Sequence, residues 1–359
     1  MSKSVFSRIF LFLFSIVVVA QTRTENSKVL LDSLYNDGHV IGASAGYLVD
    51  GEILWESAIG YANKDEKQKF NLDTQVRTAS IAKSMTAVAV MQLVAKGLID
   101  LDKPIATYIP EFIQKGDIKI TTKHVLSHTS GISAYKNSKE VENKTDFNSL
   151  KEAYDVFKDR KLRFEPGTEF FYTSYGYVVL GLLIENVSGM PYETYMQKNI
   201  WDTAGMINTG VEKFDVTREN ASALYHKQNK GKLKKATPNN LSNRIPGGGF
   251  YSTTTDVLLF GNALLNNTLI SEESLGLMTQ HHSLEKVNNS YGFGFFLYGK
   301  QPNEGSIFGH GGAQTGSSTQ LFVVPSLKTV IAVMSNTSGS GTAVSTVAGQ
   351  LIDISQQKE

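Results

Sequence analysis

The sequence contains no cysteine, so it can form no disulfide, offers no thiol nucleophile and has no N-terminal cysteine for a lipid anchor. An excess of one charge is also missing, because 35 basic and 34 acidic residues give a formal net charge of +1. The densest basic run, from Lys227 to Lys235, lacks interleaved aromatic residues and contains Gly231, which is typical of a solvated loop or hairpin. We therefore expect no nucleic-acid partner.

Several catalytic motifs are absent as well. There is no His-Glu-x-x-His, and His281 and His282 are adjacent, so on a helix their side chains would point apart. The one Gly-x-Ser-x-Gly match, at residues 42–46, lies within the hairpin expected over residues 40–58 and not at a strand-to-helix turn, so it predicts no nucleophile elbow. The run Gly247-Gly248-Gly249 lacks the Gly-Lys-Ser/Thr of a phosphate-binding loop, and a tight turn suffices to explain it. The sequence thus predicts neither a catalytic metal nor a cofactor.

A long apolar run occurs only at the N-terminus. Lys3 and Arg8 introduce apolar residues 9–20, a stretch that is short for a bilayer span, and Val18 and Ala20 suit the −3 and −1 positions of signal cleavage. We expect a signal peptide cleaved after Ala20 and export, most simply to a bacterial periplasm. If the signal stayed uncleaved, it would be the membrane anchor, and the sequence indicates no integral membrane partner.

Strand-like segments lie near both ends of the chain, and helix-like segments lie between them. The turn signal Asp50-Gly51 divides a hairpin over residues 40–58. Further strands are expected at 291–297, 320–324 and 330–334, helices at 122–127, 175–187, 253–265 and 343–354, and polar loops around 136–148 and 226–244. We predict one α+β domain over residues 21–359, with an antiparallel sheet from both termini flanked by helices. Its α/β lobe would comprise about residues 30–79 and 286–359, and its mostly helical inserted lobe about residues 80–285.

Ser80 and Lys83 begin an almost wholly apolar helix that should end at Lys96-Gly97. A hydroxyl and an amine three residues apart share one helical face, and burial of that face would lower the pKa of the amine enough to accept the serine proton. Ser-x-x-Lys also occurs at 133–136, 283–286 and 355–358, but only Ser80 opens an apolar run that belongs in a core. The alternative is a lysine that reaches solvent from a helix end.

Two further segments complete a possible acyl-transfer site. Tyr172-Thr173-Ser174 precedes a predicted helix, and a tyrosine near a lysine can carry a proton, although a core tyrosine is the alternative. His310-Gly311-Gly312-Ala313 precedes a predicted strand, and glycines beside a strand let another backbone, such as a bound substrate, approach closely. A backbone N–H from that segment and the N–H of Ser80 would serve as oxyanion donors. A solvent-facing loop histidine is the alternative there.

In their order and spacing, these three segments resemble the motifs of the serine β-lactamase and penicillin-binding-protein family, on its class C side. The resemblance extends over roughly residues 30–355 and includes Val125 to Gly131, Phe164 to Gly167 and Pro246 to Ser252. The Gly-Gly-Gly-Phe and Leu-Phe-Gly-Asn-Ala stretches are especially similar to the mitochondrial β-lactamase-like members. The resemblance implies the transpeptidase-like fold of that family.

The resemblance also implies roles for individual residues. Ser80 would be the acylated nucleophile, Lys83 would help remove its proton, and Tyr172 would act as base or proton relay. Two positions depart from the usual motifs: Ser174 replaces an asparagine and would bond Lys83 or substrate, and His310 replaces a lysine and would contact substrate or Tyr172. The backbone N–H of Ala313, next to Gly312, would join that of Ser80 in the oxyanion hole.

The expected function follows from these departures. A neutral histidine would hold the carboxylate of a β-lactam only weakly near pH 7, so ester or peptide hydrolysis is favoured. We predict a secreted serine hydrolase that cleaves a small ester, a peptide or a D-amino-acid peptide through a Ser80 acyl-enzyme. A β-lactamase or D-Ala-D-Ala carboxypeptidase remains open, because the fold sets the reaction type and not the substrate. A non-catalytic cell-wall-fragment sensor or filament-forming protein on the same scaffold, and oligomerisation in general, also remain open.

Overall fold

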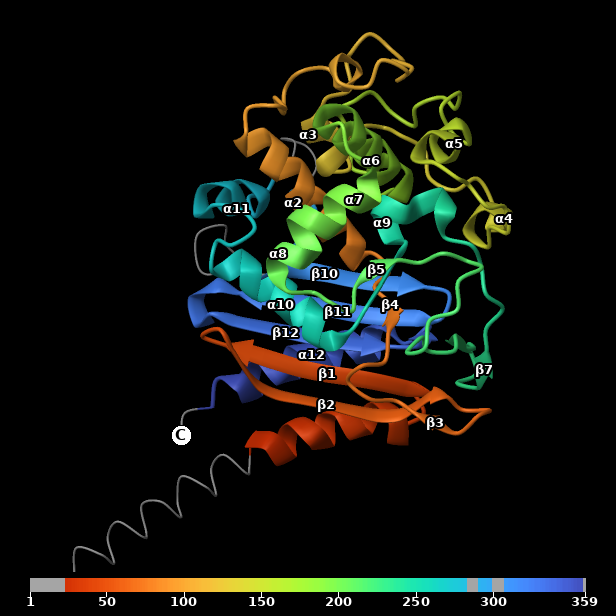
Figure 1. Cartoon of the computed structure of the whole chain (residues 1–359), viewed down its shortest axis with the longest axis vertical. Coiled ribbons are helices and arrows are strands. Elements are labelled where there is room, and N and C mark those ends of the chain that lie inside the picture. Colours follow the sequence, from red (N-terminus) through yellow and green to blue (C-terminus); the bar gives the residue numbers. More distant parts are fainter. Residues whose placement is uncertain (1–22, 283–289, 299–306, 358–359) are drawn as a thin grey trace, which may run out of the picture.

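A computed structural model of the chain describes residues 23–282, 290–298 and 307–357 (Figure 1). The expected signal peptide and its cleavage point after Ala20 lie outside these residues. The central feature is a seven-stranded antiparallel sheet. Its strand order is β3 (Gln68–Lys69), β2 (Glu52–Asn63), β1 (Gly42–Val49), β12 (Thr329–Ser335), β11 (Ser317–Val324), β10 (Ile307–Gln314) and β9 (Phe296–Tyr298).

The sheet joins the two ends of the chain through the pairing of β1 with β12. Their register runs from Ala43 opposite Ser335 to Val49 opposite Thr329. On its other side β1 pairs with β2 across the predicted turn, where Asp50 and Gly51 have φ of 49° and 87°. Positive φ at both central residues is what a type I′ hairpin turn requires. The predicted α+β fold class, with an antiparallel sheet built from both termini, is confirmed.

Helices cover both faces of the sheet. On one face lie α12 (Gly341–Ser355) and the helix of residues 23–36, which contribute Leu351 and Leu34 to a core beneath β1 and β12. On the other face lies α10 (Thr254–Leu265), where Gly261 packs so closely on β12 that a Cβ would come within 2.4 Å of Val330. The middle strands are therefore buried on both faces, as the burial of all of β11 and β12 shows.

The segment between β2 and β9 holds most of the helices of the described chain and only short strands. It contains α2 (Ile81–Ala95), α3 (Thr122–Leu126), α4 (Ser138–Val141), α5 (Leu150–Asp155), α6 (Ser174–Ser188), α7 (Tyr192–Met196), α8 (Asp202–Ala204), α9 (Ile245–Gly248), α10 and α11 (Glu272–Met278). Its short strands form two small sheets, in the orders β4 (Val76–Arg77), β8 (Phe250–Ser252), β5 (Gly210–Val211) and β13 (Thr337–Ser338), β6 (Tyr225–Lys227), β7 (Leu233–Lys235), where β13 joins from beyond β12. The lobe limits proposed from the sequence remain a prediction.

The two helices that matter for the site form where the sequence indicates. Helix α2 is buried on every side from Ile81 to Met91, so it lies in the core as its apolar run predicts. Helix α6 begins at Ser174, because the side chain of Thr173 accepts the N–H of Tyr175, and it ends at Gly189 in the left-handed region. No helix in the described parts of the chain is both long and apolar enough to cross a bilayer.

Some local predictions were wrong. The predicted strand 291–297 overlaps β9 (Phe296–Tyr298) only in its last two residues, because Gly292 donates its N–H to the carbonyl of Phe295 and closes a turn ahead of β9. The predicted loop at 136–148 contains α4, whose first turn is capped by Asn137. The basic run is the hairpin β6–β7, one of its two expected forms, and it lies within the predicted loop 226–244.

Candidate active site

Ser80 lies directly before α2, at the end of a strained turn. Ala79 has φ of 49°, a left-handed value that is uncommon outside glycine and costs about 1 kcal/mol. Ser80 is half-buried, so its hydroxyl reaches a surface that substrate can approach. In the described residues no oxygen accepts a hydrogen bond from the Ser80 backbone N–H, which is thus free to bind an oxyanion.

Lys83 is fully buried one helical turn after Ser80. Its Nζ lies 3.2 Å from Ser80 Oγ, 3.0 Å from Ser174 Oγ and 2.6 Å from the carbonyl oxygen of Gly247. Within the described residues it forms no ion pair with a carboxylate. Burial, and then the nearby charge of Arg244, lower the pKa of the Lys83 amine well below its usual range. The interpretation of Lys83 as a solvent-reaching lysine is therefore wrong.

Tyr172 lies beside this amine. The Nζ of Lys83 lies 4.8 Å from the centroid of the Tyr172 ring, and the Tyr172 hydroxyl lies 3.5 Å from Nε2 of His310. Burial raises the pKa of Tyr172 far above its ordinary value, and a hydrogen bond with Ser80 opposes this only in part. The phenol is consequently protonated at neutral pH, so it can donate a proton but is no resting base.

His310 lies in β10 and is only 1% exposed, so it is no solvent-facing loop residue. Its Nδ1 lies 2.6 Å from the Gly311 carbonyl oxygen, which can only accept, so the proton is on Nδ1 and Nε2 is the acceptor. That Nε2 faces the hydroxyls of Tyr291, at 3.1 Å, and Tyr172. Burial and the nearby amine of Lys83 lower the pKa of His310 to about 3. His310 is thus neutral, and its Nε2 lies beside the hydroxyl of Tyr172.

Gly312 is the point where β10 meets the segment before the nucleophile. A Cβ at this position would lie 2.6 Å from the Thr78 carbonyl oxygen and 2.1 Å from Oγ1 of Thr319. The backbone that approaches Gly312 is therefore a segment of the same chain. The sequence pattern predicted a close approach of another backbone but did not say which one. Close packing here holds Ser80 beside β10.

Ala313 lies next to this contact and is exposed. Strand β9 pairs with β10 only at Ile307, Phe308 and Gly309. In the described residues, the edge of β10 from His310 to Gln314 therefore has no strand beside it. Such an edge can take up an extended substrate by main-chain hydrogen bonds. The exposed Ala313 thus lies next to the close contact of Gly312 with the residues that lead into Ser80.

The structure adds residues that the sequence interpretation missed. The glycine run is more than a turn, because Gly247 offers its carbonyl to Lys83 and Gly248 accepts the side-chain N–H of Gln314 at 3.0 Å. Tyr291 supports His310 from a loop after α11 and has no local motif that could have revealed it. His128 lies beside Tyr172, in a segment whose similarity to the family was noted without a role for the residue.

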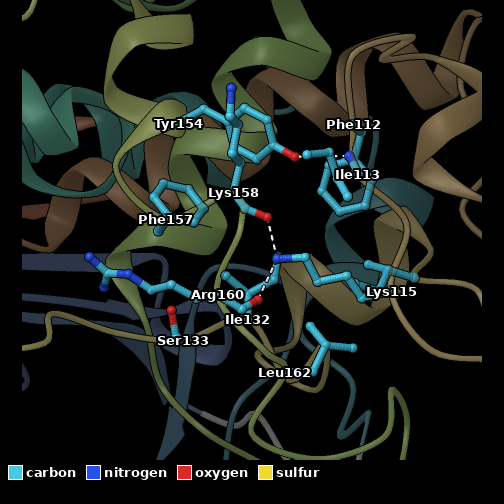
Figure 2. A pocket seen from close by; sticks show the side chains of 11 residues that line it. Phe112, Ile113, Lys115, Ile132, Ser133, Tyr154, Phe157, Lys158, Arg160 and Leu162 are labelled. Atoms are coloured by element: carbon cyan, nitrogen blue, oxygen red, sulfur yellow. Dashed lines mark hydrogen bonds between the residues drawn. The ribbon is translucent and has the colours of Figure 1, made fainter.

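The second Ser-x-x-Lys pair in the described residues is arranged differently. Lys136 is exposed, and the hydroxyl of Ser133 is buried without a hydrogen-bond partner. Ser133 lines the cavity in Figure 2, which has a volume of about 20 Å³, room for a single water. Lys115 points from that cavity to the carbonyls of Lys158 and Arg160. This cavity is too small for a substrate, and the pairs at 283–286 and 355–358 extend outside the described residues.

Comparisons with known proteins identify the family of the chain. The family model described as Beta-lactamase matches residues 24–353. The human serine beta-lactamase-like protein LACTB, mitochondrial, is 30% identical over 308 residues, which cover 67% of this chain and 56% of that protein. The putative penicillin-binding protein PbpX of Bacillus subtilis (strain 168) is 30% identical over 264 residues, or 72% of this chain and 63% of that protein. The chain thus spans somewhat more than half the length of these relatives.

A solved structure with the same fold is the D-stereospecific amidohydrolase from Streptomyces sp. It superposes with a TM-score of 0.73 and 27% sequence identity, and the match covers 89% of this chain and 97% of that one. The shared part therefore includes the sheet and the helical segment between its outer strands.

Proposed function

This chain belongs to the beta-lactamase family, and from that membership we propose that it is a serine hydrolase that works through an acyl-enzyme on Ser80. The observation that carries the proposal is the buried amine of Lys83, 3.2 Å from Ser80 Oγ. Burial lowers the pKa of this amine and so favours its uncharged form relative to a solvated lysine, and the lone pair of that form can accept a proton. Small ester or amide molecules are the proposed substrates.

The ammonium form of Lys83 can donate to all three of its neighbouring oxygens, and the neutral amine is the form that acts as the base. Such an amine has two N–H groups, which donate to the carbonyl of Gly247 and to Ser174 Oγ, and its lone pair then faces Ser80 Oγ. Ser80 Oγ transfers its proton to Lys83 as it attacks the substrate carbonyl carbon. The N–H groups of Ser80 and Ala313 stabilise the oxyanion of the tetrahedral intermediate.

Breakdown of the intermediate needs a proton on the leaving group. Tyr172 holds its proton because burial raises the pKa of the phenol, and it adjoins both Ser80 and Lys83. It donates that proton to the leaving alcohol or amine and is reprotonated by the Lys83 cation formed in the first step. Water then attacks the acyl-enzyme, and the same groups act in reverse to release the acid and restore Ser80.

The neutrality of His310 bears on the substrate. A lysine at this position would present a fixed cation, whereas His310 is buried with its pKa lowered to about 3 and attracts no carboxylate. Because the buried His310 adds no positive charge to the site, we favour an ester or amide without a free carboxylate, including an amide of a D-amino acid, in line with the D-stereospecific amidohydrolase. A β-lactamase or D-Ala-D-Ala carboxypeptidase is the second candidate, supported by the similarity to a putative penicillin-binding protein. We also propose export through the N-terminal signal.

Active-site labelling tests the acyl-enzyme. The protein is incubated with a fluorophosphonate and, separately, with a penicillin, and adducts are mapped by mass spectrometry. We expect the fluorophosphonate on Ser80, with Ser133→Ala as a matched control that leaves labelling unchanged. Absence of any label, or a label on another residue, contradicts the proposal. A panel of p-nitrophenyl esters, D-amino-acid amides and nitrocefin then ranks substrates, and efficient nitrocefin turnover without esterase or amidase activity would reverse our order.

A further inference from the structure

His128 holds the backbone on both sides of Tyr172. Its carbonyl oxygen accepts the N–H of Phe171 at 2.8 Å, and its Nδ1 accepts the N–H of Thr173 at 3.3 Å. Since Phe171 and Thr173 are the two neighbours of Tyr172, one residue fixes the direction in which the Tyr172 side chain leaves the main chain. These two hydrogen bonds are sufficient to explain how His128 holds the backbone on both sides of Tyr172.

The ring of His128 also supports the ring of Tyr172. The two ring centroids lie 4.4 Å apart, and the Tyr291 centroid lies 4.8 Å from His128. His128 is only 1% exposed, so it cannot touch a substrate. Because Nδ1 accepts a hydrogen bond, the proton is on Nε2, which has no hydrogen-bond partner and lies among aromatic rings. The imidazole therefore acts on the site only through its neighbours.

A histidine is also a costly choice at this place in the chain. His128 follows Ser127, the residue that caps the C-terminus of α3, and has φ of 59°. Helices commonly place glycine or asparagine in this left-handed position, because other side chains cost about 1 kcal/mol there. A buried imidazole with one unsatisfied donor adds a further cost. The end of α3 by itself gives no reason for a histidine at this position, whereas the two hydrogen bonds to the neighbours of Tyr172 do.

We propose that His128 is a positioning residue that keeps the hydroxyl of Tyr172 directed between Ser80 and His310. The inference rests on the proposed function, because it takes Tyr172 as the proton carrier of a Ser80 acyl-transfer site. It adds to that function a residue of the segment Val125 to Gly131, to which the sequence assigned no catalytic role.

Two substitutions of His128, each compatible with its left-handed backbone, test the role of Nδ1 as a hydrogen-bond acceptor. His128→Asn can keep an oxygen near the place of Nδ1, whereas His128→Gly keeps none. We expect fluorophosphonate labelling of Ser80 and kcat for a p-nitrophenyl ester to fall roughly tenfold to a hundredfold in His128→Gly, with KM little changed, and most of the loss to be absent in His128→Asn. His128→Leu, which fills the space but accepts nothing, covers the case in which the glycine variant does not fold. Equal kcat values in the folded variants and the unsubstituted protein would overturn the inference.

A double-mutant cycle separates positioning from general damage. If His128 acts through the Tyr172 hydroxyl, His128→Gly should cause at most about a twofold further loss in a Tyr172→Phe protein. The same fold-loss in both backgrounds would mean that His128 acts elsewhere, and the proposal would fail.

A crystal structure of the His128→Gly or His128→Leu protein distinguishes this proposal from the proposed function. We expect the Tyr172 hydroxyl to leave its place 3.5 Å from His310 Nε2. A hydroxyl that stays there refutes positioning by His128, whether or not the protein is a hydrolase. Conversely, a protein whose Ser80 takes no label, while Tyr172 shifts in the variant, refutes the proposed function and leaves the positioning role standing.

Discussion

The carbonyl oxygen of Gly247 lies 2.6 Å from the amine of Lys83 and anchors it from a helix 164 positions further along the chain. A carbonyl can only accept, so one N–H of Lys83 is committed to it. That commitment orients the remaining bonds of the amine toward Ser80 and Ser174. The relationship explains why the glycine run belongs to the site although it carries no reactive side chain.

Replacing Gly247 should disturb this arrangement without removing any functional group. A Cβ at Gly247 would lie 3.0 Å from the carbonyl oxygen and 3.1 Å from Cβ of Ser174, so Gly247→Ala should push the start of α6 away from Lys83. We expect roughly a tenfold or greater loss of Ser80 labelling rate, and about 1–3 kcal/mol of destabilisation. Gly248→Ala is the control, because its nearest atom would lie at 3.6 Å, an ordinary contact. Equal behaviour of the two variants would contradict the anchor role.

Lys83 should be irreplaceable by another cation. Lys83→Ala removes the base, and Lys83→Arg supplies a guanidinium that stays protonated, so both should lower the acylation rate by roughly 10²–10⁴-fold. Activity of the unsubstituted protein should fall as the pH drops below the lowered pKa of Lys83, because only the neutral amine accepts the serine proton. Pre-steady-state release of p-nitrophenol across a pH series measures both effects. Lys136→Ala, at the exposed lysine of the other described pair, should leave the rate unchanged, and an active Lys83→Arg protein would exclude Lys83 as the base.

His310 should make stability fall as the solution is acidified. Its pKa is about 3 in the folded chain and near 6.5 when unfolded, so between these values only the unfolded state binds the proton. The free energy of unfolding should therefore rise with pH across this window, with a slope of up to about 1.4 kcal/mol per pH unit from this residue. Urea unfolding of His310→Gln should show a shallower slope than the unsubstituted protein. The exposed His226→Gln variant is the control, and identical slopes for all three proteins would refute the assignment.

Gly312 should tolerate no side chain. Its Cβ would meet the backbone oxygen of Thr78 at 2.6 Å, and a main-chain atom in the core cannot move cheaply. We expect Gly312→Ala to lower the free energy of unfolding by roughly 1–3 kcal/mol and to shift the turn before Ser80, which should reduce labelling as well. Gly311→Ala serves as the control, because the nearest atom to its Cβ would be at the flexible end of the Gln320 side chain, at 3.2 Å. Thermal unfolding together with fluorophosphonate labelling distinguishes the two, and a stable, fully active Gly312→Ala protein would contradict the close approach.

The sequence was most informative where a local signal sets the structure. The turn at Asp50-Gly51, the apolar helix behind Ser80, and the helix expected over residues 253–265, which begins at the side-chain cap of Thr253, each depend on neighbouring residues, and each of these elements forms as predicted. The short loop that starts at Tyr291 was misread as strand, because its turn depends on a hydrogen bond from Gly292 to Phe295 and on packing against α2 that composition does not reveal.

For the candidate site, the sequence by itself determined which groups the chain carries and the order in which they occur: a nucleophile and an amine one helical turn apart, then a tyrosine, then a histidine-glycine segment. Only the tertiary structure decided their charge states and their supports. Burial makes Lys83 a weak base, keeps the proton on Tyr172 and keeps His310 neutral, and burial depends on elements remote in sequence. The roles of Gly247 and His128 were also decided by the tertiary structure. The carbonyl oxygens of these residues and the imidazole of His128 acquire a role only when folding brings their hydrogen-bond donors within reach.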